Sequence, residues 1–193
     1  MNSNYDSLLS RRSIRRYKPE LPPKADLEKI IEAGLYAASG HGLQSSIIVA
    51  VTRRELRDRL MEMNRVIGGW KEGFDPFYGA PAVLLVLADK ASPNHVYDGS
   101  LTMGNLMQAA HDLGLGSCWI NRAREEFASE EGKAILRELG IEGDWEGVGH
   151  CVLGYIDGEE PRPAPRRAGS CSRAAASCSW VFRSWAWASA SST

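Results

Sequence analysis

The sequence lacks a long hydrophobic run and carries no excess of charge of either sign. Its longest apolar run covers residues 82–88, far short of the roughly 20 residues that cross a membrane as a helix. Lysine and arginine number 23 against 24 aspartate and glutamate residues, for a formal net charge of −1. A general nucleic-acid binder would show a basic excess or a basic stripe. We therefore expect neither a membrane nor a nucleic acid as partner.

The usual signatures of metal, disulfide and self-contained catalytic chemistry are also absent. The four cysteines form no C-x-x-C pair, and the four histidines have no metal-ligand spacing, so we expect no bound metal and reduced thiols. Cys118 and Cys151 lie in apolar runs and are expected to be buried and inert. The first ten residues hold no signal-peptide core, which favours a cytoplasmic protein. No P-loop, H-E-x-x-H, nucleophile elbow or Rossmann fingerprint occurs.

Helical and strand patterns interleave along the chain, whose 193 residues suffice for one domain with a sizeable core. Apolar spacing predicts helices over residues 5–12, 23–35, 53–64 and 129–139, and one more that carries Met103 to Ala110. We expect Asp98 or Ser100 to cap that helix and Gly114 to end it. Residues 67–80 predict a loop. Apolar runs predict four strands of one central sheet at 47–52, 81–88, 115–121 and 148–155.

Residues 11–17, R-R-S-I-R-R-Y, concentrate four guanidinium groups and a hydroxyl in an otherwise nearly neutral chain. Guanidinium forks and short hydroxyls are groups that proteins use to hold a dianionic phosphate. A solvated basic face at the end of the first helix is the alternative, because most charge runs lie on the surface. A phosphate clamp without a resident catalytic group is typical of a protein whose chemistry is done by a bound cofactor.

The composition changes from Ala168 onward. Residues 168–193 hold eight serines, seven alanines, three tryptophans and two cysteines, and no acidic residue. Neither strand alternation nor a helical stripe organises them. We interpret residues 168–193 as an atypical tail, either frame-shifted or specific to a lineage, which follows a domain of residues 1–167.

Five segments together resemble the FMN-dependent nitroreductase family. R-R-S-I-R at 11–15 is similar to the family's opening R-R-S-x-R, and A-A-S-G-H-G-L-Q at 37–44 to its A-P-S-A-x-N-x-Q. F-Y-G-A-P at 77–81 is similar to Y-x-A-P, and residues 109–120 to A-A-x-x-x-G-L-G-S-C-W-I. The last motif corresponds to Gly154-Tyr155 followed by Pro165-Arg166-Arg167. The resemblance implies an α+β fold with a mixed, mostly antiparallel central sheet flanked by helices, in a homodimer with two FMN sites at its interface.

The resemblance also implies which residues bind the cofactor: Arg11, Arg12, Ser13, Arg15, Ser39, Gly40, Gln44, Trp119, Ile120, Asn121 and Arg166. The first three would hold the FMN phosphate, which Arg166 would reach from the far end of the chain. Arg15 would lie along the ribityl chain or near the pyrimidine edge, where a cation stabilises negative charge on the ring. Residues 119–121 would line the ring, partly through backbone groups. Residues 39–44 would approach it from the partner subunit, and Arg16 is expected to be a surface charge.

The chain departs from the family pattern in the second segment and at its end. Gly42 replaces an Asn, Ala38 replaces a Pro, and Ser45-Ser46 replace a Pro-Trp pair. These changes predict that one hydrogen bond to the flavin is lost or supplied by backbone, and that the substrate side of the pocket is wider. The tail does not resemble the segment that crosses to the partner in this family, which predicts a weaker dimer and a less firmly held Arg166.

The resemblance implies an FMN-dependent NAD(P)H oxidoreductase of the nitroreductase type. NAD(P)H would reduce the flavin, and an acceptor such as a nitroaromatic or a quinone would then take the electrons in a ping-pong exchange. One alternative keeps FMN but changes the reaction to dehalogenation or flavin fragmentation. Another is a flavin-binding regulatory or storage module without turnover, which the atypical tail and the altered second segment favour.

Overall fold

The computed structural model describes residues 4–166 of the chain. In chain order the elements are α1 (Asn4–Ser10), α2 (Lys24–Leu35), the 3₁₀ turn η1 (Gly40–Gly42), β1 (Ser46–Val51), α3 (Arg54–Ile67), β2 (Ala82–Asp89), α4 (His95–Asp112), β3 (Gly116–Ile120), α5 (Ala123–Ala128), α6 (Glu130–Glu138) and β4 (Trp145–Gly154). The predicted tail from residue 168 lies outside the described residues. Within residues 4–166, every helix is too short or too polar to cross a bilayer.

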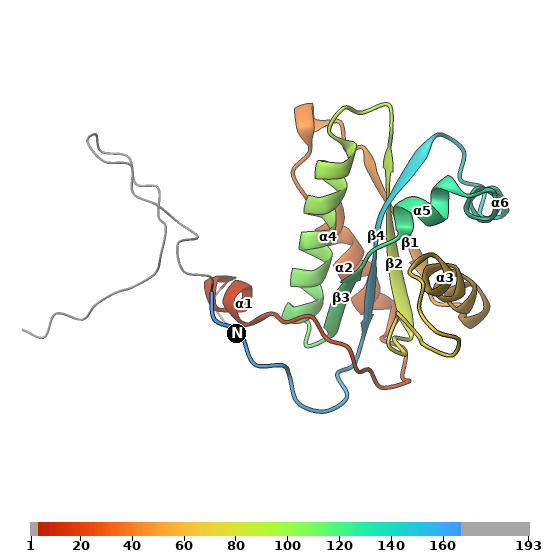
Figure 1. Cartoon of the computed structure of the whole chain (residues 1–193). Coiled ribbons are helices and arrows are strands. Elements are labelled where there is room, and N and C mark those ends of the chain that lie inside the picture. Colours follow the sequence, from red (N-terminus) through yellow and green to blue (C-terminus); the bar gives the residue numbers. More distant parts are fainter. Residues whose placement is uncertain (1–3, 167–193) are drawn as a thin grey trace, which may run out of the picture. The chain divides into compact units, whose positions relative to one another are not determined.

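The four strands form one sheet in the order β1-β2-β4-β3, and each neighbouring pair is antiparallel. Figure 1 shows α2 and α4 on one face of this sheet and α3, α5 and α6 on the other. A parallel bridge between Ser13 and Ser117 places the segment after α1 beside β3. The predicted α+β fold, with a mostly antiparallel central sheet flanked by helices, is confirmed.

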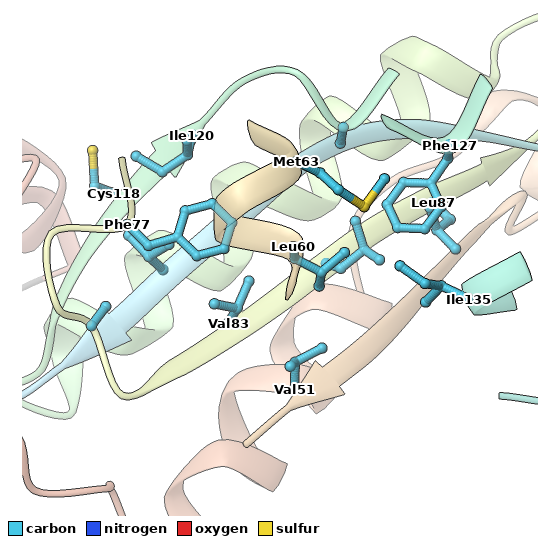
Figure 2. Packing of buried hydrophobic residues seen from close by; sticks show 14 of the residues in the cluster. Val51, Leu60, Met63, Phe77, Val83, Leu87, Cys118, Ile120, Phe127 and Ile135 are labelled. Carbon is cyan, nitrogen blue, oxygen red and sulfur yellow. The ribbon is translucent and has the colours of Figure 1, made fainter. Parts of the chain in front are cut away.

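Side chains along β2 alternate between two hydrophobic cores, one on each face of the sheet. Val83 belongs to the core beneath α3, α5 and α6, and its neighbour Leu84 belongs to the core beneath α2 and α4. Residues 82–88 are all buried, as expected for a strand that helices cover on both faces. Figure 2 shows the first core, in which Phe77 and Leu60 lie beside Val83.

Helix α4 begins earlier than its sequence predicts, and Asp98 bonds to a distant segment. The helix starts at His95, so Asp98 and Ser100 lie inside it and neither caps it. Asp98 is 4 % exposed, and its carboxylate accepts hydrogen bonds from the Gly40 N–H (2.9 Å) and the Ser45 hydroxyl (2.8 Å). The predicted capping role is therefore wrong, since a cap bonds to N–H groups of its own helix.

The apolar pattern does not predict α5, whose six residues are too few for helical spacing to be recognised. Tertiary packing sets its position instead. A Cβ at Gly147 of β4 would lie 2.2 Å from the Ala123 carbonyl oxygen, so only glycine allows this approach. The helix predicted over residues 129–139 is α6, and Ser129 caps it by accepting from the Gly132 N–H (3.1 Å). The prediction that Gly114 ends α4 is confirmed by its φ of 76°.

An ion pair fixes the predicted loop between α3 and β2. Arg57 of α3 is 8 % exposed, and its guanidinium contacts the Asp75 carboxylate and donates to the Ala80 carbonyl (3.2 Å). Asp75 also accepts from the backbone N–H groups of Phe77 (2.7 Å) and Gly79 (2.9 Å). One carboxylate therefore holds both the loop and the helix beside it.

The substitution Asp75→Ala is expected to lower the free energy of unfolding by about 2–3 kcal/mol. It leaves the buried Arg57 guanidinium with only the more exposed Asp58 as counter-ion, and it removes the acceptor of the Phe77 and Gly79 N–H groups. Asp144→Ala is the matched control. It removes an exposed pair with Lys90 and should cost less than about 1 kcal/mol. Urea denaturation measures both values, and equal losses for the two variants would contradict this account of the loop.

Candidate functional site

The segment that follows α1, residues 11–17, is called here the arginine segment, and its apolar side chains face inward. Ile14 and Tyr17 are buried, whereas Arg15 and Arg16 between them are exposed. The Ile14 N–H donates to the Ser117 carbonyl of β3 (3.0 Å), and the Tyr17 hydroxyl donates to the Ile14 carbonyl (2.7 Å). These contacts fix the backbone beside the start of β3 and leave charged groups facing outward.

Two guanidinium groups of this segment have buried nitrogen atoms without a partner. Nη1 of Arg11 and Nε of Arg12 make no hydrogen bond to any residue that the structure describes. Nη1 of Arg12 donates to the carbonyls of Leu9 and Arg11, both at 2.7 Å, which orients its guanidinium. Unpaired buried donors of charged groups are costly. The pair, with Ser13 next in the chain, therefore fits an anion with several acceptor oxygens, such as the phosphate of FMN.

Two buried thiols lie behind the arginine segment. Burial raises the pKa of the Cys118 thiol, an effect that Arg15, a hydrogen bond from Ser13 and the charge of Arg11 partly offset. Burial also raises the pKa of Cys151, which lies on β4 in the core on the other face of the sheet, to about 12. Both cysteines are free and buried. The prediction that they are buried and inert is therefore confirmed in its structural part, and their raised pKa values keep them protonated near neutral pH.

Arg15 lies over the ring of Tyr78, with its Cζ 5.9 Å from the ring centroid. This cation–π contact links the arginine segment to the loop before β2. Tyr78 has a φ of 55°, a left-handed backbone conformation that is uncommon for a residue with a large side chain. Arg16 instead forms an exposed ion pair with Asp157 (3.2 Å), as predicted for a surface charge.

The predicted ring-lining residues at the end of β3 point in different directions. Trp119 packs on the α2 and α4 side, and its Nε1 is buried without a partner among residues 4–166. Gly149 makes room for it, since a Cβ there would lie 2.3 Å from that nitrogen. Ile120 is 8 % exposed in the opposite core, so only its backbone remains for a cofactor. Asn121 is exposed, and its carbonyl accepts from Nδ2 of Asn64 (2.7 Å).

The second predicted segment, residues 39–44, is a tight turn, called here the glycine turn. His41, Gly42 and Gln44 have φ values of 55°, 67° and 50°. The Ser39 hydroxyl accepts from the Gln44 N–H (3.0 Å) and closes the turn. Asp98 anchors it to α4 through the two hydrogen bonds given above. The turn is therefore a built feature of the fold and does not depend on the missing family residues.

A hollow of about 140 Å³ lies beside the glycine turn. Ser39 and Gln44 line it together with Ser45 and Ser46, which stand where the resembled family has Pro and Trp. Clefts for cofactors and other ligands usually measure about 300–1,000 Å³. The hollow is therefore too small to enclose a cofactor without surfaces from elsewhere.

The arginine segment and the glycine turn lie at opposite ends of α4. Near its C-terminal end, Ser10 contacts His111 (2.8 Å) and Ser7 contacts Asp112, which ties down α1. Asp98 holds the glycine turn near the N-terminal end, and 14 residues of helix correspond to about 21 Å. Figure 1 shows α1 and residues 40–42 at the two ends of α4. Within one chain, the structure groups Arg11, Arg12 and Ser13 with β3 but keeps Ser39, Gly40 and Gln44 apart from them.

Arg166 belongs to a separate unit of the chain that begins at Arg162. Its Nη2 donates to the Ala164 carbonyl (2.9 Å), and its side chain is exposed. A contact between Arg166 and the cofactor phosphate stays a prediction.

Sequence reasoning missed two residues that organise the site. The sequence predicts Asp98 as a helix cap, although it anchors the glycine turn. The motif that contains Tyr78 does not indicate its contact with Arg15. For Asp98, the available sequence signal is a lone acidic residue on an apolar helix face. For Tyr78, it is a tyrosine directly before a glycine. In the part of the chain that the structure describes, no cluster of three or more His, Cys, Asp or Glu side chains could hold a metal ion.

Known proteins resemble this chain in sequence over more than half of its length. An archaeal protein of Methanothermobacter thermautotrophicus, whose name proposes an NADH dehydrogenase or NAD(P)H nitroreductase, is 27 % identical over 118 residues. The match covers 59 % of this chain and 58 % of that protein, so the chain spans little more than half of that relative's length. The iodotyrosine deiodinase of Thermotoga neapolitana is 30 % identical over 135 residues, which cover 61 % of this chain and 73 % of that enzyme.

Solved structures and a family model agree with this pattern. The crystal structure of a nitroreductase with bound FMN from Bacteroides fragilis matches with a TM-score of 0.79 and 28 % identity, over 89 % of this chain and 98 % of that one. The model of the Nitroreductase family matches residues 8–155, which include the arginine segment, the glycine turn and β3. This chain therefore belongs to the nitroreductase family.

Proposed function

We propose that this chain is an FMN-dependent oxidoreductase that transfers a hydride from NAD(P)H, through the flavin, to an acceptor such as a nitroaromatic or a quinone. The observation that carries the proposal is the pair of guanidinium nitrogens on Arg11 and Arg12, beside Ser13, that have no hydrogen-bond partner within residues 4–166. FMN bound to the Bacteroides fragilis relative supports the cofactor, and the name of the archaeal relative supports the nicotinamide.

FMN, when bound, supplies the redox chemistry, and the chain's own residues bind and orient. Arg11, Arg12 and Ser13 hold the phosphate through charge-assisted hydrogen bonds. Arg15, steadied by Tyr78, places a cation where negative charge develops on the ring, which favours acceptance of a hydride. Trp119 lies on β3, the strand beside Ser13, and its buried indole N–H is a further donor.

The glycine turn that completes each site comes from a second copy of the chain. Its position about 21 Å along α4 from the arginine segment separates the two groups within one protomer. In the proposed dimer, a twofold axis perpendicular to α4 places the two copies of α4 antiparallel. Each glycine turn then lies beside the partner's arginine segment. This arrangement accounts for a hollow beside Ser39 and Gln44 that is too small by itself.

The outer surface of α4 and α1 supports such a pairing. Tyr97 and Leu101, one helical turn apart on α4, are 72 % and 51 % exposed, and Leu8 and Leu9 of α1 are 63 % and 56 % exposed. Large exposed apolar patches mark interaction surfaces in proteins. A second copy of the chain buries them in the proposed homodimer.

Reductive dehalogenation is the second candidate function. The observation that favours it is the 30 % identity to iodotyrosine deiodinase over 73 % of that enzyme. Iodide released from iodotyrosine by the reduced protein, with no turnover of nitroaromatics or quinones, would decide in its favour.

An absorbance experiment tests the proposed function. The protein reconstituted with FMN is expected to be yellow, to bleach when NADPH or NADH is added without oxygen, and to regain its colour with a quinone or nitroaromatic. A preparation that cannot take up FMN would refute the proposal. Bound FMN that neither nicotinamide reduces would indicate a flavin-binding module without turnover.

The substitution Arg11→Gln is expected to weaken FMN binding by about tenfold to a hundredfold, because hydrogen bonds to charged groups contribute about 1.5–3 kcal/mol. Riboflavin lacks the phosphate, so its affinity should not change. Fluorescence titration measures both ligands, with the exposed Arg16→Gln as the matched control. Equal losses for FMN and riboflavin would show that Arg11 does not contact the phosphate.

The substitution Leu101→Asp is expected to convert the dimer to a monomer and to abolish tight FMN binding, because it places a charge on the proposed α4 interface. Val66→Asp alters a residue of α3 that is 61 % exposed on the other face of the sheet, and it should leave both properties unchanged. Light scattering and FMN titration measure them. A Leu101→Asp monomer that still binds FMN tightly would contradict the shared site.

A further inference from the structure

A buried polar cluster lies directly behind the end of β3. Asn64 of α3, Glu126 of α5 and His150 of β4 are all 0 % exposed. Nε2 of His150 lies 2.9 Å from Oε2 of Glu126. Buried charged and polar groups of this kind are costly unless their contacts serve the fold or a site. The function proposed above uses none of these three side chains.

Asn64 links this cluster to a predicted cofactor residue. Its Nδ2 donates to Oε1 of Glu126 (2.6 Å) and to the carbonyl of Asn121 (2.7 Å). An amide nitrogen carries two hydrogens, so both of its donors are used. One side chain therefore joins a fully buried carboxylate to the backbone of the residue that follows β3.

The contacts of Glu126 with Asn64 and His150 hold the Asn64 side chain in its bridging position. The pair lies within ion-pair distance but is not aligned as a hydrogen bond, and Oε2 of Glu126 has no hydrogen-bond partner in the described part of the chain. The His150 ring is packed against Phe77, with ring centroids 5.1 Å apart. Within residues 4–166, the hydrogen bond that the Glu126 carboxylate does accept comes from Asn64. Loss of the Asn64 amide would leave a buried carboxylate unsatisfied.

The backbone that Asn64 holds is conformationally strained. Arg122 has a φ of 83°, a conformation that is unfavourable for a residue with a side chain and persists only where the surroundings enforce it. On its far side, Gly147 packs tightly against Ala123. Strain of this kind is concentrated at ligand-binding segments. The held turn therefore has a conformation that the local sequence alone does not favour.

The geometry of one peptide unit connects Asn64 to the cofactor side. The Asn121 carbonyl and the Arg122 N–H belong to the same planar trans unit, in which the two groups point in opposite directions. Because Asn64 draws the carbonyl toward the core, the N–H is directed away from it. The exposed Asn121 is one of the residues predicted to line the ring partly through backbone groups, and this N–H is such a group.

We propose that Asn64, backed by Glu126 and His150, is a positioning residue for the cofactor. It fixes the peptide unit between Asn121 and Arg122 so that the N–H is presented to the flavin in a set orientation. The inference rests on FMN being the cofactor and concerns residues that the proposed function does not use.

The test compares Asn64→Leu with Leu60→Ala in the full-length protein. Leu60 lies one turn away on α3 and is 1 % exposed, so its truncation destabilises the core beside Asn64 without removing the amide. Three readouts are taken: FMN affinity, the rate of flavin reduction by NAD(P)H at saturating FMN, and amide hydrogen exchange of residues 121–123 in the cofactor-free protein. Asn64→Ser, which keeps a single donor, is the milder variant if Asn64→Leu does not fold.

For Asn64→Leu we expect FMN to bind about tenfold more weakly and the reduction rate to fall about tenfold, with an unchanged KM for the nicotinamide, because a misplaced cofactor loses reactive geometry. Exchange at residues 121–123 should rise well above that of Leu60→Ala, which should keep FMN affinity and reduction rate within about threefold of wild type. Asn64→Ser should fall between the two.

Equal values for the Asn64 and Leu60 variants in affinity, rate and exchange would overturn the proposal and leave Asn64 a structural residue. The oxidoreductase function and the role of Asn64 can be refuted independently of each other. A wild-type protein that binds FMN but is not reduced by either nicotinamide refutes the oxidoreductase function, while the affinity and exchange comparisons still decide the role of Asn64.

Discussion

Helix α4 sets the distance between the two segments that carry the predicted cofactor contacts. Its 18 residues form a rod of about 27 Å. Asp98 ties the glycine turn near one end, and Ser7 and Ser10 tie α1 and the arginine segment to the other. A hydrogen-bonded helix does not shorten, so the two segments of one chain stay apart. This constraint favours a site that two chains share.

Several features of the candidate site lower the stability of the fold, and long-range contacts around the site compensate for them. Three features lower the stability of the isolated fold: the buried guanidinium nitrogens, an indole N–H without a partner in the described part of the chain, and a strained Arg122. The core on β2 and the ion pair of Arg57 with Asp75 offset part of that cost. Binding energy from an anionic cofactor would offset more of it, because a ligand that binds only the folded state stabilises that state.

The sequence predicts the sheet well because β2 and its neighbours are apolar runs buried on both faces, which leave a local signal. It predicts α5 poorly, since a six-residue helix positioned by Gly147 has almost no pattern of its own. The sequence does not predict the role of Asp98, because the pattern of a carboxylate near a helix start is the same whether it caps that helix or binds a distant turn. The cluster of Asn64, Glu126 and His150 joins residues far apart in the chain, so no local pattern reveals it.

The candidate site was predictable only in part for the same reason. Motif resemblance indicates which residues bind FMN, but not that the glycine turn and the arginine segment lie at opposite ends of α4. Nor does it show that Trp119 and Ile120 face opposite sides of the sheet, although the period of two along a strand requires it. Those relations depend on packing between elements, and they decide that Ile120 offers only its backbone.

Subunit complementation tests the shared site most directly. Arg12→Glu disrupts the arginine segment and Ser39→Glu disrupts the glycine turn, so neither variant alone should bind FMN tightly. If each site takes these two residues from different chains, unfolding and refolding the two variants together should restore tight FMN binding in about a quarter of the sites, since half of the dimers are mixed and each has one intact site. If both residues serve a site within one chain, the mixture should bind no more FMN than the separate variants, and that result would contradict the account.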